Sequence, residues 1–549
     1  MYVEPFVMRN RTIGQILDDT IARFPDNDAV VYADRDYRRT WAELGRDVDV
    51  LAKGLMALGI QRGDKVALWS SNVPFWVGFM FATARIGVTL LTVNTSYREK
   101  ELEYLLTQSE CENLVVMDGF RDHDYLQTVY TLIPEIRLQP RGHMRSARFP
   151  HLRRVMFLGM EKHRGMYSIP EIQSLSVMIS DEEYAERKAS VQPDDVVNMQ
   201  YTSGTTGFPK GVMLSHNNIG NNGYWIGYHQ GFTDKDRLCL PVPLFHCFGC
   251  SLGIMACVNT GAALIILEGF KTVPVMMAIE KERCTALYGV PTMFISIMEH
   301  PLFDRVDFSS MRTGIMAGSV CPEPLMKRAV KEMNLREITN VYGLTESSPG
   351  MTQTHRDEEF KRRVSTVGRA MPGVEVKVAD PETCIEMPRG TPGEIMCRGY
   401  NVMKGYYNMP EETAKAITPD GWLHSGDLGI MDEDGYLIIT GRIKDMIIRG
   451  GENIYPRELE EFLAGLEGVL DVQVVGTPSE KYGEEVAAFV ISKPGADLTP
   501  EDVRDFCRGK IAWHKIPKHV ALVEGFPLTA SGKVKKFELR KMAMEMFPA

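Results

Sequence analysis

The sequence predicts an α/β protein that continues into a β-rich region and ends in a piece with its own strands and helices. From Thr12 to Leu138, helical stretches such as 40–58 alternate with short apolar runs such as 65–69. This alternation is typical of βα units and favours a parallel sheet. From 365 to 439, Gly and Pro recur between short alternating runs, which indicates antiparallel strands.

The middle and the end of the chain carry weaker signals. The region 139–184 is rich in Arg, His and Pro and is predicted to form surface connections before a second α/β half. Residues 238–267 contain no Asp, Glu, Lys or Arg, but Pro and Gly interrupt them repeatedly. We therefore expect a buried strand, a core helix and a second strand there rather than a membrane span, while peripheral membrane contact stays open. From 442 onward a helix is expected to start near Pro456.

Composition places the chain among ordinary globular proteins. It has 549 residues, of which 44% are hydrophobic and 24% charged, enough for several domains with cores. A net charge of -10 and the lack of a sustained basic stripe argue against nucleic acid as a partner. The N-terminus has no secretory pattern and the ten cysteines have no regular spacing. We expect free thiols in a cytoplasmic protein without a transmembrane segment, as a monomer or homodimer.

Residues 201–211 read Tyr-Thr-Ser-Gly-Thr-Thr-Gly-Phe-Pro-Lys-Gly, the composition of a phosphate-binding loop. Glycines let backbone amides approach phosphate oxygens, hydroxyls donate hydrogen bonds and the lysine supplies charge. The candidate ligands are Thr202, Ser203, Gly204, Thr205, Thr206, Gly207 and Lys210. The loop is not a Walker A loop, because Pro209 and Gly211 stand where that pattern needs Gly and a hydroxyl. Apolar runs on both sides predict strands, with Ser215 capping the next helix, and the loop predicts use of ATP.

Three further segments carry chemistry. Asn340-Val-Tyr-Gly-Leu-Thr-Glu346 offers an aromatic ring for a base, a hydroxyl for phosphate and a carboxylate for Mg²⁺. A packed Tyr with a capping Thr and a solvated Glu explains that segment equally well. Trp422-Leu-His-Ser-Gly-Asp427 ends in a carboxylate at a tight turn, which could accept both hydroxyls of a ribose. Segments 441–445 and 449–456 combine a charged joint with a glycine pair before a helix, where a domain could swivel.

His246 and the following Cys247-Phe-Gly-Cys250 form the one cluster that resembles a metal or redox site. A second ligand pair is missing and the surroundings are apolar. A structural role is therefore favoured for this cluster.

Five motifs in order resemble those of the adenylate-forming superfamily, which contains acyl-CoA synthetases, peptide-synthetase adenylation domains and luciferases. They are the loop at 201–211, Tyr-Gly-Leu-Thr-Glu at 342–346, Ser-Gly-Asp at 425–427, Gly-Arg-Ile-Lys-Asp at 441–445 and Leu-Thr-Ala-Ser-Gly-Lys at 528–533. The resemblance covers nearly the whole chain and is greatest to fatty or other carboxylic acid CoA ligases.

This resemblance implies a large N-terminal domain, residues 1–441, with two α/β subdomains and a β-rich subdomain. A small, mobile α+β C-terminal domain, residues 442–549, would follow. It also implies two half-reactions in one cleft: ATP and a carboxylic acid give acyl-AMP and pyrophosphate, and CoA then displaces AMP, with Mg²⁺ as the metal. A carboxylate is a poor electrophile, so conversion to a mixed anhydride provides the leaving group that the thiol needs.

The same resemblance assigns the nucleotide site residue by residue. Tyr342 would lie on adenine, Thr345 near the α-phosphate, and Glu346 would bind Mg²⁺. The rest of the implied nucleotide site consists of Gly318, Ser319, Asn340, Gly343, Asp427 at the ribose hydroxyls and Arg442 at ribose or phosphate. Lys533 would bridge the substrate carboxylate and the α-phosphate, Lys444 would be the hinge, and Gly450 and Gly451 would shape the CoA tunnel after rotation.

The acid itself is less well defined. His246 matches a position at the acyl and pyrophosphate boundary, although a core histidine is the alternative. The candidate acyl-pocket residues are Trp225, Gly227, Ala317, Gly343, Pro349 and Gly350. None is charged, which favours an apolar acid, and a bulky Trp225 favours a medium-chain or compact cyclic one. The alternatives are an alicyclic or aromatic acid, a carrier-protein-dependent adenylation enzyme and a luciferase-like oxygenase.

Overall fold

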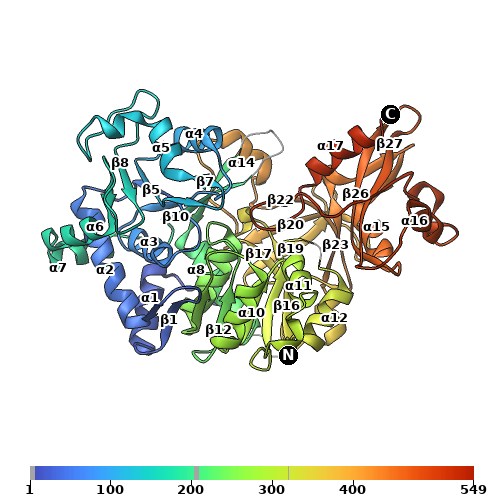
Figure 1. Ribbon diagram of the computed structural model, residues 1–549, viewed down its shortest axis with the longest axis horizontal. Coiled ribbons are helices and arrows are strands. Elements are labelled where there is room, and N and C mark those ends of the chain that lie inside the picture. The colour runs from blue at the N-terminus through green and yellow to red at the C-terminus, as the bar shows by residue number, and fades with distance from the viewer. Residues whose placement is uncertain (1–5, 203–208, 320, 549) are drawn as a thin grey trace.

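Two mainly parallel sheets dominate the computed structural model, which describes residues 6–202, 209–319 and 321–548 (Figure 1). The first sheet has the order β21 (Gly405–Tyr406), β11 (Lys210–Ser215), β10 (Val196–Thr202), β4 (Thr89–Thr92), β3 (Lys65–Trp69), β5 (Asn113–Val116), β8 (Arg154–Phe157), β9 (Tyr167–Ser168). The second has the order β18 (Arg369–Ala370), β17 (Gly350–Gln353), β16 (Glu337–Gly343), β15 (Thr313–Ala317), β14 (Ala286–Gly289), β12 (Arg237–Leu240), β13 (Ala263–Ile266), β1 (Asp28–Tyr32), β2 (Tyr37–Thr40). Parallel neighbours need crossover connections, and helices supply most of them.

Helices connect and cover these sheets. Those of the larger part are α1 (Ile13–Arg23), α2 (Trp41–Ala57), α3 (Pro74–Arg85), α4 (Glu99–Gln108), α5 (Tyr125–Leu132), α6 (Ile169–Leu175), α7 (Asp181–Ala189), α8 (His216–His229), α9 (Met255–Thr260), α10 (Thr272–Lys281), α11 (Pro291–Met298), α12 (Glu323–Glu332), α13 (Phe360–Ser365) and α14 (Pro410–Ala416). Short turns of helix are η1 (Pro134–Arg137), η2 (Ser176–Met178), η3 (Phe248–Ile254), η4 (Phe303–Arg305) and η5 (Thr345–Ser347). None of the helices in the described ranges is long and apolar enough to cross a membrane.

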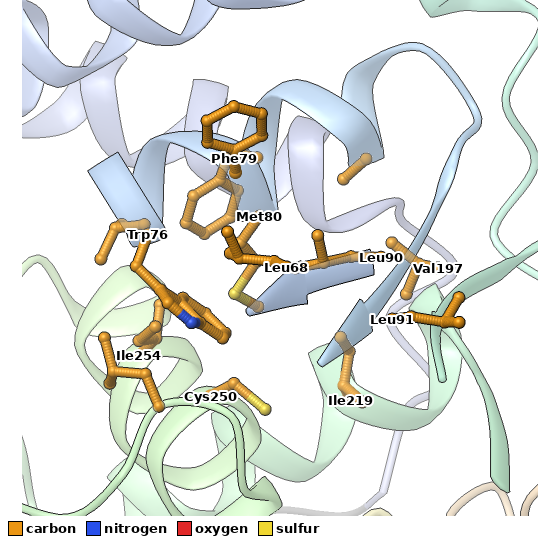
Figure 2. Packing of buried hydrophobic residues seen from close by; sticks show 14 of the residues in the cluster. Leu68, Trp76, Phe79, Met80, Leu90, Leu91, Val197, Ile219, Cys250 and Ile254 are labelled. Atoms are coloured by element: carbon orange, nitrogen blue, oxygen red, sulfur yellow. The ribbon is translucent and has the colours of Figure 1, made fainter. Parts of the chain in front are cut away.

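The core lies between the sheets and their helices. Figure 2 shows Trp76, Phe79 and Met80 of α3 packed with Leu68 of β3 and Leu90 of β4. All five side chains are almost completely buried, and such burial contributes about 25 cal/mol for each Å² of apolar surface removed from water. The core thus joins the first sheet to η3 and α8, which lead to the site.

An antiparallel sheet follows and then a smaller α+β part. The antiparallel sheet has the order β19 (Val374–Ala379), β20 (Gly393–Gly399), β22 (Leu423–Met431), β23 (Leu437–Arg442). The last part contains β24 (Ile447–Arg449), β25 (Glu452–Ile454), β26 (Val469–Ser479), β27 (Gly483–Ser492), β28 (His519–Leu522), α15 (Pro456–Leu463), α16 (Pro500–Cys507), α17 (Lys536–Met546), η6 (Ile443–Asp445) and η7 (Trp513–Lys515). It lies at the right-hand end of the view in Figure 1. A small hairpin of β6 (Gly119–Phe120) and β7 (His123–Asp124) stands apart.

The predicted fold class is confirmed, including the parallel α/β halves, the antiparallel region and the helix that begins at Pro456. Ser215 caps α8, its hydroxyl accepting the Asn218 N–H at 3.2 Å. The expectation of surface connections over 139–184 was wrong in part, because β8 in that region is a paired and mostly buried strand of the first sheet. Its four residues are too few to stand out among the flanking arginines. The predicted domain boundary falls at the end of β23.

Candidate active site

Asp427 is the centre of one half of the site. The Tyr342 hydroxyl at the end of β16 donates to Asp427 Oδ2 at 2.9 Å, and Arg442 Nε donates to Oδ1 at 2.8 Å. Asp427 and Arg442 face each other in the register of β22 and β23, which explains why they pair. The negative charge of Asp427 raises the pKa of Arg442, and burial raises that of Tyr342 well above its usual range. The structure therefore brings a ring, a carboxylate and a guanidinium together.

The turn before Asp427 is held from both sides. Gly426 has φ +70°, which glycine adopts without strain, and its N–H donates to Glu394 Oε1 at 2.9 Å. The Asp427 N–H donates to Ser425 Oγ at 3.0 Å. The position of the Asp427 carboxylate thus depends on Glu394 of β20.

Glu346 lies beside the strands that carry the phosphate loop. Its Oε1 accepts hydrogen bonds from Thr202 Oγ1 at 3.2 Å and from the Tyr406 hydroxyl at 2.9 Å. Lys210 is the register partner of Thr202 and forms an ion pair with Glu412 of α14. Ser203, Gly204, Thr205, Thr206 and Gly207 lie outside the described residues. Thr202 and Lys210, at the two ends of the predicted loop, therefore contact Glu346 and Glu412.

The Glu346 carboxylate would suit a magnesium ion that nucleotide phosphates also bind. Among the residues with described placement, no group of three or more His, Cys, Asp or Glu could hold a metal alone. Mg²⁺ commonly takes one or two carboxylates and completes its shell with phosphates and water, so the Glu346 carboxylate has suitable chemistry.

Lys533 reaches the site from the C-terminal part of the chain. Thr292 Oγ1 of α11 donates to the Gly532 carbonyl at 3.2 Å, which docks the loop that carries Lys533. A Cβ added at Gly318, where φ is +91°, would lie 3.1 Å from Lys533 Cε. Burial lowers the pKa of Lys533. The structure thus places the predicted bridging lysine against the predicted purine-binding glycine, and Ser319 follows as an exposed residue.

His246 and Cys247 connect this lysine to η5. His246 Nδ1 accepts the Phe248 N–H at 3.2 Å, and burial and the Lys533 charge lower the pKa of His246 to about 3. His246 is therefore neutral at ordinary pH. Cys247 Sγ lies 3.6 Å from Thr345 Oγ1, and burial raises its pKa to about 11. These contacts support the packing role favoured for the cysteine over redox chemistry.

The candidate acyl-pocket residues divide into two groups. A Cβ at Gly343 would lie 1.7 Å from the Pro349 carbonyl oxygen, and Gly350 exchanges two hydrogen bonds with the Asn222 side chain of α8. Ala317, at the end of β15, is 5% exposed. These residues lie at or next to the ends of strands in the second sheet.

Trp225 and Gly227 lie further along α8. Trp225 is 2% exposed and packs against Phe6 and Tyr228, with ring centroids 6.3 and 5.3 Å away. Gly227 faces α9 instead, since an added Cβ would lie 3.1 Å from Thr260 Cγ2. Its contacts support helix packing and do not support the predicted place in the pocket.

Four other predicted residues make mainly structural contacts. The Asn340 side chain donates to the Thr366 carbonyl at 3.3 Å. Lys444 is exposed in η6, and its carbonyl accepts from Arg540 at 3.1 Å. Gly450 and Gly451, with φ of +61° and +88°, form the turn between β24 and β25.

Sequence reasoning missed Tyr406, Glu412 and Thr292. Tyr406 reaches Glu346 because β21 pairs with β11, Val212 opposite Tyr406. Neither Tyr406 nor Glu412 lies in one of the recognised motifs. Thr292 follows a proline at the start of α11, an ordinary helix-start signal that gives no hint of a partner in the C-terminal part.

Comparison with known proteins identifies the family to which the chain belongs. Residues 17–407 match the AMP-binding enzyme family and 458–533 match the AMP-binding enzyme C-terminal domain. The chain is 52% identical to a putative acyl-CoA synthetase, YngI of Bacillus subtilis (strain 168), over 98% of each chain. It is 39% identical to the mitochondrial medium-chain acyl-CoA ligase ACSF2 of Danio rerio, over 97% of this chain and 88% of that one.

Solved structures agree in fold. ATP-bound MatB from Rhodopseudomonas palustris has a TM-score of 0.83 at 29% identity, covering 97% of this chain and 99% of that one. The chain belongs to the AMP-binding, adenylate-forming enzyme family. Within that family it is an acyl-CoA synthetase, an AMP-forming acid–CoA ligase that uses ATP and CoA.

Proposed function

We propose that this enzyme joins an apolar carboxylic acid, a medium-chain fatty acid above others, to CoA through an acyl-adenylate. The observation that carries the proposal is the position of Lys533, which lies against Gly318 and next to a neutral His246. None of the candidate pocket residues carries a charge, which suits an apolar tail. Medium-chain ligases among the relatives support the same substrate class.

In the first step the residues of the chain neutralise and position negative charge. Lys533 would draw the substrate carboxylate to the α-phosphate, where two anions must meet, and Thr345 would donate to that phosphate. Asp427 would hold the ribose hydroxyls and Tyr342 the base. A Mg²⁺ ion held by Glu346 would offset the charge of the departing pyrophosphate.

In the second step CoA needs room at the same carbonyl carbon. We propose that residues 442–549 rotate about Lys444, so that Lys533 leaves the site and Gly450 and Gly451 approach it. The exposed position of Lys444 between β23 and β24 suits a hinge, since a few residues at element ends absorb such motions. We also propose a cytoplasmic enzyme, in keeping with ten cysteines that are all free.

A panel of carboxylic acids tests the proposal. Pyrophosphate and AMP release are measured for linear acids of increasing length and for cyclic acids, with and without CoA. Thioester formed only with CoA, and fastest with medium-chain acids, is expected. Pyrophosphate release that ignores CoA would point to a carrier-dependent or oxygenase activity, and a preference for ring acids would replace the fatty acid.

The Lys533→Ala variant tests the two-step assignment. It should lose adenylation yet keep most of its rate when acyl-AMP and CoA are supplied directly. The matched control is Lys541→Ala on α17, which should leave both rates unchanged. Equal loss of the two half-reactions in Lys533→Ala would contradict the proposed alternation.

A further inference from the structure

Cys384, Glu394 and His424 form a nucleophile, orienting group and base in the antiparallel sheet. Cys384 Sγ lies 3.7 Å from His424 Nε2, and His424 Nδ1 lies 2.8 Å from Glu394 Oε2. Cys384 comes from the turn between β19 and β20, Glu394 from β20 and His424 from β22. A thiol within reach of a base that a third group orients is the arrangement of an activated nucleophile.

The hydrogen bonds fix where the proton sits. An ionised carboxylate only accepts, so His424 Nδ1 carries a hydrogen and Nε2 presents its lone pair to the thiol. The hydrogen bond to Glu394 raises the pKa of His424, and burial opposes it. Charges of both signs surround this turn, since Lys377 Nζ donates to the Cys384 carbonyl at 2.9 Å and the Asp380 carboxylate accepts from Thr383. Proton transfer from the thiol to His424 Nε2 would therefore leave the Cys384 sulfur beside an imidazolium cation, an arrangement typical of reactive thiols.

Cys384 is also the accessible cysteine. All ten cysteines are free, and nine of them are buried, whereas Cys384 is partly exposed. It has φ +57° in a turn where Asp380 Oδ1 accepts the Thr383 N–H at 2.8 Å. Reagents in solution can thus reach this thiol before the others.

The same three residues connect to the nucleotide site. Glu394 is 3% exposed, and its second oxygen, Oε1, accepts the Gly426 N–H at 2.9 Å. Gly426 directly precedes Asp427. His424 thus connects the Cys384 thiol to the carboxylate that also holds the turn before Asp427.

We propose that Cys384 is a thiol-modification site for small disulfides, and that the mixed disulfide weakens nucleotide binding through Glu394 and the turn before Asp427. The thiol proton passes to His424 Nε2, and the thiolate attacks one sulfur of the disulfide. A new S–S bond forms to Cys384 while the original S–S bond breaks, and the leaving thiolate takes the proton from His424. Cys384 is oxidised, the small disulfide is reduced, and excess free thiol reverses the step. The effect on nucleotide rests on the proposed role of Asp427, whereas the thiol chemistry does not.

The first experiment measures thiol reactivity of the full, native chain without any substrate. Dithiodipyridine releases a coloured thione for each cysteine that reacts, and peptide mass spectrometry locates the adduct. A fast phase of one equivalent at Cys384 is expected, absent in Cys384→Ser. His424→Gln and Glu394→Gln should slow it about tenfold or more, while His143→Gln, an exposed control, should not. A fast phase that survives Cys384→Ser, or an unchanged rate in His424→Gln, would overturn the assignment.

The second experiment measures the effect on the enzyme. Protein carrying a glutathione disulfide adduct at Cys384 should show an ATP KM raised about threefold or more with a smaller change in kcat, and dithiothreitol should restore it. Cys384→Ser and Cys384→Ala should keep the basal KM and be insensitive to the treatment. An unchanged KM in the modified wild type would refute the coupling. If the proposed role of Asp427 is itself wrong, the Asp427→Asn variant will instead show a normal ATP KM.

Discussion

Replacing Asp427 by Asn isolates one charge in the proposed ribose site. The substitution keeps the size of the side chain and one carbonyl oxygen, which can still accept from Arg442 Nε. The new amide can donate to the Tyr342 hydroxyl, which accepts as well as donates. Because the Arg442 side chain is 55% exposed, its charge is solvated and not stranded. We therefore expect the variant to fold.

The effect on ATP follows from the hydrogen bonds that the charge would make. A hydrogen bond to a charged group is worth about 1.5–3 kcal/mol and one between neutral groups about 0.5–1.5 kcal/mol, so each ribose hydroxyl loses about 1–1.5 kcal/mol. Two hydroxyls lose about 2–3 kcal/mol, which corresponds to an ATP KM raised about 30- to 150-fold. The kcat should fall much less, because the nucleotide is held in the ground state as well as in the transition state.

The assay is pyrophosphate release against ATP concentration at saturating acid and CoA, with thermal unfolding followed in parallel. Asp420→Asn is the matched control, since Asp420 lies on the exposed turn before β22 and its carboxylate accepts from Thr418 Oγ1 at 2.7 Å. It should leave the KM unchanged. An Asp427→Asn enzyme that is folded and has an ATP KM within about twofold of wild type would refute the ribose assignment.

Three other outcomes are expected. Burial lowers the pKa of Lys533 from 10.5, so its ammonium form is lost at a lower pH than that of an ordinary lysine. The adenylation rate should therefore fall at that lower pH on the alkaline side of a pH–rate profile. Lys533→Arg should move this fall to higher pH. Trp225→Ala should shift the ratio of kcat/KM about tenfold toward longer acids, whereas Trp422→Ala should not, and an unshifted ratio would remove Trp225 from the pocket. Gly343→Ala places a Cβ 1.7 Å from the Pro349 carbonyl oxygen and should lower the free energy of unfolding by about 1–3 kcal/mol or more, measured by thermal or urea unfolding. Gly525→Ala is the control and should be neutral, because an added Cβ there has nothing within 4 Å.

The sequence predicted those parts of the fold in which local pattern and tertiary environment agree. The apolar runs around the phosphate loop became β10 and β11, and the alternating runs after 365 became an antiparallel sheet. The pairing of Asp427 with Arg442 was not predicted, and it comes from the register of β22 and β23. β8 was not predicted, because its apolar run is only three residues long and follows two arginines.

Contacts between distant segments could not be predicted in this way. The hydrogen bond from Tyr406 to Glu346 depends on which strand lies at the edge of the first sheet, and no local pattern specifies that. The orientation of Gly227 toward α9 also depends on how two helices cross, since a glycine on a helix offers no side chain to indicate its partner. The sequence therefore predicted which residues belong to the candidate site, and the tertiary structure supplied the contacts among them.

The ion pair between Lys210 and Glu412 sets a threshold for anions at the phosphate loop. Glu412 is held ionised by Lys210 and Lys415, and its pKa is about 2, so the pair persists throughout the ordinary pH range. An incoming anion gains only the difference between its own attraction to Lys210 and that of Glu412. A single carboxylate or inorganic phosphate offers little advantage, whereas a polyphosphate offers several charges at once. On the proposed function, this exchange discriminates ATP from the small anions of the cell and lets Glu412 recapture Lys210 as pyrophosphate departs.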